Sequence, residues 1–127
     1  MHQAAEMMTE LLASTAAAPT KDNRRAIRVR MKVPVFMHTD EGSIRFLTRD
    51  ISLFGLGMSG QHSLRIDQTV GVTLCLPGGA RIKVSARVVW VERESFGLNF
   101  VQMSALHRLS LGEALLNNMP WWQSMWF

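Results

Sequence analysis

The feature that most limits what this chain can fold into is a run of alternating apolar residues between Ala80 and Glu92. A period of two places successive side chains on opposite faces of an extended strand. One face of this segment is almost entirely apolar, which is typical of a strand with one buried face. The residues expected on this face are Ile82, Val84, Ala86, Val88 and Trp90, and those expected on the other face are Lys83, Ser85, Arg87, Val89 and Val91.

Five more segments have a similar character, and turn residues such as Pro77-Gly78-Gly79 separate them. Short strands without long helices between them favour an antiparallel barrel. We therefore predict a mostly β protein, built as a six-stranded antiparallel β-barrel. Pro34 lacks a backbone donor, so the first strand should have an edge or a bulge there. The six strands are expected at Arg28–Met37, Ile44–Arg49, Leu56–Ser59, Val70–Leu76, Ala80–Glu92 and Phe96–Val101.

Helices are expected only near the two ends of the chain. Ser104 is a good N-cap for an amphipathic helix that runs to about Asn117 and covers one barrel opening. Residues 3–18 have the composition of a short amphipathic helix, but we expect a mobile tail rather than a helix that docks on the domain or a partner. The expected parts are residues 1–23 (helix and linker), 24–118 (barrel domain with its helix) and 119–127 (a tail with three tryptophans). The tail should pack against its own domain or a second copy, or else contact a partner protein.

Composition excludes several classes of protein. With 127 residues the chain holds one domain, and its formal charge of +4 suits an anionic partner. Cys75 is the only cysteine, which excludes an intrachain disulfide and a cysteine-cluster metal site. No apolar run approaches the ~18 residues that span a bilayer, and no secretory signal is present, so a cytoplasmic location is expected by default.

Neither an enzyme nor a nucleic-acid-binding protein fits the sequence well. The four histidines are scattered without metal-ligand spacing, and no pair of carboxylates stands out, so we expect no catalytic activity, no metal and no cofactor. A DNA- or RNA-binding barrel would interleave exposed aromatic residues with its basic groove. Here the aromatic residues gather at the C-terminus, away in sequence from the arginines.

Two polar motifs carry the functional signal. Four arginines fall within residues 24–30, just before the first strand. After the second strand, Asp50 and Ser52 are two residues apart, so in an extended chain they would share one face and offer a carboxylate and a hydroxyl together. Gly55 and Gly57 follow. The alternative interpretation of this second motif is an ordinary Asx or Ser turn at the end of a strand.

Together the two motifs resemble those of the PilZ domain family, which binds the bacterial second messenger cyclic di-GMP. The resemblance covers about Arg24 to Asn118 and consists of Arg24-x-x-x-Arg28 followed by Asp50-x-Ser52-x-x-Gly55. It implies a stand-alone PilZ domain in which Leu64 or Ile66 plugs the barrel. Asn23, where some relatives carry a basic residue, leaves the ligand stoichiometry open.

The resemblance also assigns roles to single residues. Arg24 and Arg28 would clamp guanine edges and phosphates, and Arg25 would add a stacking or phosphate contact. Asp50 would accept from the guanine N1 and N2 groups, and Ser52 would hydrogen-bond base or phosphate. Gly55 would keep the loop close to the ligand, where a Cβ would collide. Trp90 would either lie near the ligand or belong to the core.

The function implied is a cyclic di-GMP receptor that changes conformation and signals to a protein partner in motility, pili or exopolysaccharide control. Repulsion among the arginines would keep the N-terminal arm mobile until the doubly anionic ligand wraps it onto the barrel. Homodimerisation is open. The alternative is an interaction adaptor with a non-binding PilZ-like barrel.

Overall fold

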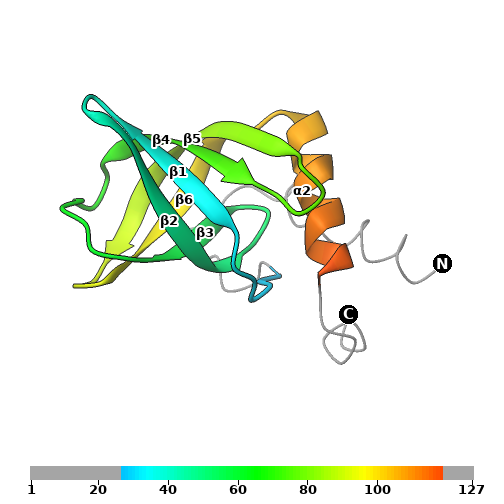
Figure 1. Ribbon diagram of the computed structural model, residues 1–127, viewed down its shortest axis with the longest axis horizontal. Helices are drawn as coiled ribbons and strands as arrows, with labels where there is room; N and C mark the ends of the chain where they lie inside the picture. The colour runs from blue at the N-terminus through cyan, green and yellow to red at the C-terminus, as the bar shows by residue number, and fades with distance from the viewer. Residues whose placement is uncertain (1–26, 119–127) are drawn as a thin grey trace.

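A computed structural model describes residues 27–118 of the chain. In this range six strands precede one helix: β1 (Pro34–Thr39), β2 (Gly42–Ile51), β3 (Gly55–Ser59), β4 (Thr69–Cys75), β5 (Arg81–Val91), β6 (Ser95–Gln102) and α2 (Ala105–Asn117). The strands form a closed barrel in the order β1-β2-β3-β6-β5-β4, and every neighbouring pair is antiparallel (Figure 1). The predicted barrel and C-terminal helix are confirmed. The predictions for residues 1–23, Arg24, Arg25 and 119–127 lie outside the described residues.

Alternate side chains of the strands fill the barrel. Phe46 and Phe96 meet edge to face inside it, with ring centroids 5.0 Å apart. In the β3–β4 connection Leu64 is half-buried against the core, whereas Ile66 is 57% exposed, so Leu64 is the residue of the two that packs inward. Fully or nearly fully buried residues from all six strands make up the centre: Val35, Met37, Ile51, Leu56, Met58, Val72, Leu74, Ile82, Val88, Phe96 and Leu98.

Helix α2 lies across one end of the barrel (Figure 1). Its N-cap is Ser104, whose hydroxyl accepts a hydrogen bond from the His107 backbone N–H at 3.1 Å, as the sequence predicts. Leu111 and Leu115 are fully buried and belong to the same core as the strands. The helix is therefore part of the hydrophobic core.

The first strand begins later than its apolar pattern predicts. Residues 27–33, which we call the arm, run beside the end of β2 without forming a regular strand. Val29 makes two backbone hydrogen bonds with Ile51, of 2.8 and 2.9 Å, and is fully buried. The edge predicted at Pro34 is confirmed, because Pro34 pairs with Leu47 of β2 but the pairing of β1 with β4 begins only at Val35. A missing N–H is tolerated at the first position of a strand.

The alternation of β5 also breaks where the sequence does not predict it. Val88 pairs with Leu98, but Trp90 pairs with Gly97, so the register shifts between these two steps. Such a bulge turns the following side chains to opposite faces. Val91 consequently packs against the core, while Trp90 leaves the face that it was predicted to share with Val88.

Candidate ligand-binding site

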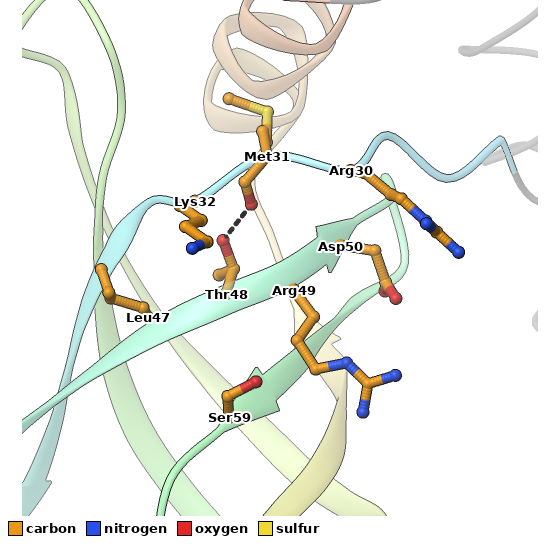
Figure 2. A pocket seen from close by; sticks show the side chains of 8 residues that line it. All are labelled: Arg30, Met31, Lys32, Leu47, Thr48, Arg49, Asp50 and Ser59. Carbon is orange, nitrogen blue, oxygen red and sulfur yellow. Dashed lines mark hydrogen bonds between the residues drawn. The ribbon is translucent and has the colours of Figure 1, made fainter.

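A bulge in β2 decides which way Asp50 points. Thr48 pairs with Met58 and Asp50 pairs with Gly57, so Arg49 is the extra residue on β2. In a regular strand Asp50 would share the inward face of Thr48, which is buried. The bulge instead turns both Arg49 and Asp50 outward and returns Ile51 to the core (Figure 2). A carboxylate is thereby placed on the outer face of the barrel.

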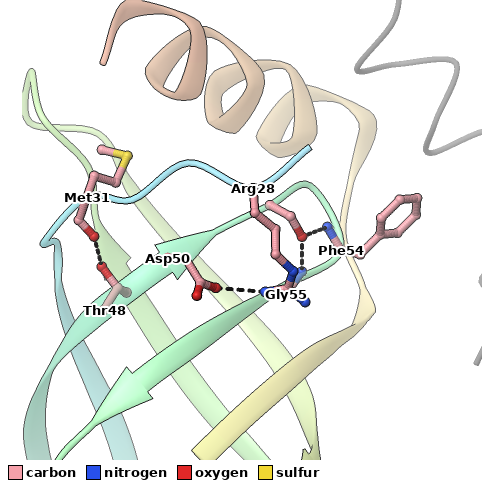
Figure 3. Close-up of polar contacts among 7 residues, drawn as sticks. Arg28, Met31, Thr48, Asp50, Phe54 and Gly55 are labelled. Carbon is pink, nitrogen blue, oxygen red and sulfur yellow. Dashed lines mark hydrogen bonds and ion pairs between the residues drawn. The ribbon is translucent and has the colours of Figure 1, made fainter. Parts of the chain in front are cut away.

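Arg28 of the arm meets this carboxylate. Its Nη1 donates a 2.7 Å hydrogen bond to Asp50 Oδ1, forming an ion pair (Figure 3). The two side chains are 36% and 28% exposed, so a molecule in solution can reach both. The buried Val29 next to Arg28 fixes the arm here. The structure thus brings together one residue from each of the two sequence motifs, 22 positions apart.

Two glycines bring Trp90 to the same face as Asp50. Four residues on neighbouring strands lie side by side in one row across the sheet: Asp50 of β2 pairs with Gly57 of β3, Gly57 pairs with Gly97 of β6, and Gly97 pairs with Trp90 of β5. A Cβ on Gly57 would lie 2.9 Å from Asp50 Oδ1, and a Cβ on Gly97 would lie 2.0 Å from Trp90 Nε1. The carboxylate therefore lies over β3 and the indole over β6. Adjacent strands are about 4.8 Å apart, so the glycines allow these two groups to approach each other.

Ser52 and Gly55 have structural roles in this conformation. Ser52 is fully buried, and its hydroxyl accepts 3.1 Å hydrogen bonds from the backbone N–H groups of Phe54 and Gly55. It therefore does not share the face of Asp50, and its hydroxyl faces the backbone of the following turn. A Cβ on Gly55 would lie 2.0 Å from the carbonyl oxygen of Leu98. This collision with β6 is enough to make glycine necessary there.

Sequence reasoning missed the two glycines of the row and three cations near Asp50. Gly57 follows the second motif and Gly97 interrupts the sixth strand, but neither pattern indicates that they face each other. Arg30, Lys32 and Arg49 line a pocket with Asp50. The alternating basic residues of the arm were the only signal for that pocket, and that signal fits a solvated strand equally well.

The described residues contain no group of three His, Cys, Asp or Glu side chains placed to hold a metal ion. Nor does any helix among residues 27–118 have the length and hydrophobicity to span a bilayer.

Three of the solved structures that share this fold are similar to the chain over most of its length. The inhibitor of motility MotI/DgrA of Bacillus subtilis superposes with a TM-score of 0.68 at 19% identity, over 76% of this chain and 51% of its own, so this chain spans about half its length. The PilZ domain of YcgR from Escherichia coli, solved with c-di-GMP, gives 0.64 at 14% identity, over 76% of this chain and 92% of that domain. The PilZ domain of CeSA from a cellulose synthesizing bacterium gives 0.55 at 19% identity, over 72% and 96%. A comparison with curated proteins gives no significant match.

The family follows from the sequence match and the barrel together. Residues 22–117 match the PilZ domain, which is most of the chain and includes both polar motifs. The chain belongs to the PilZ domain family, a family of cyclic di-GMP receptor domains.

Proposed function

We propose that this chain binds cyclic di-GMP on the outer face of β2, β3 and β6 and relays that event to a protein partner. The single observation behind the proposal is the ion pair of Arg28 with Asp50, which lies on the glycine row that ends at Trp90. The YcgR domain, which has the same fold, was solved with c-di-GMP.

The paired side chains match the two edges of guanine. A carboxylate accepts hydrogen bonds, and guanine offers the N1–H and N2–H donors, so Asp50 reads that edge. Guanidinium donors match O6 and N7 on the opposite edge, where Arg28 contributes. Asp50 Oδ1 accepts a hydrogen bond from Arg28, whereas Oδ2 accepts none from residues 27–118. The pair therefore holds the carboxylate in place before the ligand arrives.

Trp90 supplies a stacking surface next to this pair. Its indole lies over Gly97 and is only half-buried, so part of the ring faces solvent. Stacking of a base on an aromatic side chain contributes about 1–3 kcal/mol. In this proposal Ser52 and Gly55 shape the loop, and Arg24 and Arg25, which precede the arm in sequence, add phosphate or base contacts.

We propose a narrower conformational change than the one that the sequence suggests. Val29 is hydrogen-bonded to Ile51 and buried, so the arm is packed against the end of β2. We place the ligand-dependent change before Ile27. Hydrogen exchange tests this, because cyclic di-GMP should then protect peptides from residues 1–26 while exchange in residues 27–33 changes little.

Calorimetric titration with cyclic di-GMP tests the receptor function. Wild-type protein should bind saturably. Arg28→Ala and Asp50→Asn should each weaken binding by about tenfold or more, because hydrogen bonds to charged groups contribute about 1.5–3 kcal/mol. Asp50→Asn keeps the shape but turns an N–H donor toward guanine donors. Trp90→Ala should weaken binding by a similar factor.

Asp40→Asn is the matched control, because Asp40 is an exposed carboxylate in the β1–β2 turn. It should bind like the wild type. Absence of heat from the wild type, together with an unchanged melting temperature in the ligand's presence, would refute the proposal. The chain would then be a PilZ barrel that acts as an interaction adaptor without the ligand.

A further inference from the structure

A pocket opens beside Asp50, between the arm and β2. Its volume is about 630 Å³, within the range of small-molecule sites. Figure 2 shows Arg30 and Arg49 extending to the same side as the carboxylate of Asp50. The residues that line the pocket are Arg30, Met31, Lys32, Leu47, Thr48, Arg49, Asp50 and Ser59.

The backbone holds this pocket open by an arch in the arm. The arch is anchored at one end by the Val29–Ile51 hydrogen bonds and at the other by the bond from Thr48 N to Val33 O, of 3.1 Å. Between these anchors the arm has three residues, 30–32, and β2 has two, 49 and 50. The longer side must bow away from the shorter one. Thr48 Oγ1 fixes the bow, because it donates to Met31 O at 2.6 Å and accepts from Val33 N at 2.8 Å.

The charge of the pocket is strongly positive. Three of the residues that line it, Arg30, Lys32 and Arg49, are cationic. Its one carboxylate, Asp50, is already paired with Arg28 at 2.7 Å. Within the part of the chain that the structure describes, none of the three cations has a carboxylate within salt-bridge distance. An anion in the pocket would offset the mutual repulsion of these groups.

Phosphate is the anion that suits these side chains best. Two guanidinium groups offer planar forks that match phosphate oxygens bidentately, and lysine adds a point charge. Ser59 places an additional hydroxyl at the rim. The volume is generous for a single phosphate group, so the group is expected to belong to a larger molecule.

We propose that this pocket is a phosphate-binding subsite, in which Arg30, Lys32 and Arg49 hold a phosphate group. Two sources share this chemistry. One is a phosphodiester of the cyclic dinucleotide. This source rests on the proposed function above, and it is suggested by Asp50, which lines both the pocket and the proposed dinucleotide site. The other is a separate phosphate-bearing molecule that binds whether or not the dinucleotide does.

The first experiment tests the pocket alone, with pyrophosphate as the probe and the full chain as the sample. Backbone amide and arginine Nε–H signals are followed by NMR during titration at constant ionic strength. Saturable shifts are expected at Arg30, Lys32, Arg49 and Ser59. Arg30→Gln and Arg49→Gln should each weaken this binding about tenfold, because a charge-assisted hydrogen bond is lost.

Arg45→Gln is the matched control, since Arg45 is an exposed arginine on the same strand but outside the pocket. It should leave the pyrophosphate affinity unchanged. Shifts no larger than those produced by sodium chloride would overturn the proposal. So would shifts spread evenly over all basic residues, because they would mark general screening rather than a site.

The second experiment identifies the source by titrating the same variants with cyclic di-GMP. About tenfold weaker binding by Arg49→Gln and Arg30→Gln, but not by Arg45→Gln, would assign the pocket to a phosphodiester of the dinucleotide. Unchanged dinucleotide affinity with lost pyrophosphate binding would assign it to a separate phosphate-bearing molecule. Pyrophosphate binding by a wild type that ignores cyclic di-GMP would refute the receptor function and keep the phosphate pocket.

Discussion

At the scale of single residues, the candidate site depends on positions that orient the side chains around them. Gly97 is one of them, since any side chain there would occupy the place of the Trp90 indole. Arg49 is another, because as the extra residue of the β2 bulge it turns Asp50 outward. Ser52 holds the turn that follows. In each case the geometry of the site depends on a residue next to the group that it positions.

Replacing Gly97 with alanine should displace the indole of Trp90. The new Cβ would lie 2.0 Å from Nε1, and the crowded atoms belong to a side chain, so the ring moves while the barrel stays folded. We expect a large change in the Trp90 indole N–H signal by NMR and a loss of about 1–3 kcal/mol in unfolding free energy.

Gly71→Ala is the control for this change. Gly71 also lies in a strand, but the nearest atom to its added Cβ is His38 Cδ2 at 3.9 Å, which is ordinary contact. An unmoved Trp90 signal in Gly97→Ala would contradict the placement of the indole over β6.

Ser52→Ala should destabilise the fold without touching the outer face. The substitution leaves the N–H groups of Phe54 and Gly55 without their 3.1 Å acceptor at a fully buried position. The expected loss in urea denaturation is about 1–3 kcal/mol. Ser63→Ala, at an exposed position in the β3–β4 connection, should change stability little. Equal stability of the two variants would argue that Ser52 does not support the turn.

At the scale of elements, the arm behaves as an irregular extension of β1. Its apolar residues keep the two-residue period of a strand, and Val29 and Val33 are buried as that period predicts. Its backbone nevertheless curves away from β2. The reason is that Met31 O and Val33 N bond to the side-chain hydroxyl of Thr48 rather than to the backbone of β2. The same bow separates Arg30 and Lys32 from β2 and forms the basic pocket.

Thr48→Val should loosen the arm. Valine has nearly the shape of threonine but leaves Met31 O and Val33 N without the hydroxyl partner. Hydrogen exchange of the Val33 amide should accelerate, and stability should fall by about 1–3 kcal/mol. Thr69→Val, at an exposed position of β4, serves as the control and should leave exchange in the arm unchanged. Unaltered exchange at Val33 in the Thr48 variant would refute the arch.

The secondary-structure elements were largely predictable from the sequence alone, but their irregularities were not. Hydrophobic period and turn residues were enough for six strands, their order along the chain and the helix that Ser104 caps. The bulges in β2 and β5 were not predictable, because a bulge depends on which residue lies opposite. The apolar run that ends at Trp90 does not indicate that Gly97 pairs with Trp90. The motif residues Arg28 and Asp50 were found, but the outward direction of Asp50 depends on such a bulge.

At the scale of the whole molecule, the core and the candidate site are separate. The barrel interior is filled by side chains, and the Arg28–Asp50 pair lies on its outer face. Binding there does not require the core to open. A ligand at 100 times its Kd should still add about 2.7 kcal/mol to stability by mass action, so a rise in melting temperature is a fair screen for binding.

Helix α2 and the barrel should unfold as one unit, because they share a single core. Leu115 is fully buried among the strands, and Leu115→Ala should cost about 2–5 kcal/mol of unfolding free energy. The loss should appear at the same urea midpoint for a helix probe, circular dichroism at 222 nm, and for a barrel probe, the ring signals of Phe46 and Phe96. Leu106→Ala is the matched control, since Leu106 lies on the same helix but is 73% exposed, and it should change stability little. Separate midpoints, with the barrel probe unaffected by Leu115→Ala, would mean that the helix merely rests on a barrel that is stable alone. In that case the end of the barrel under α2 would be able to open independently of the binding face.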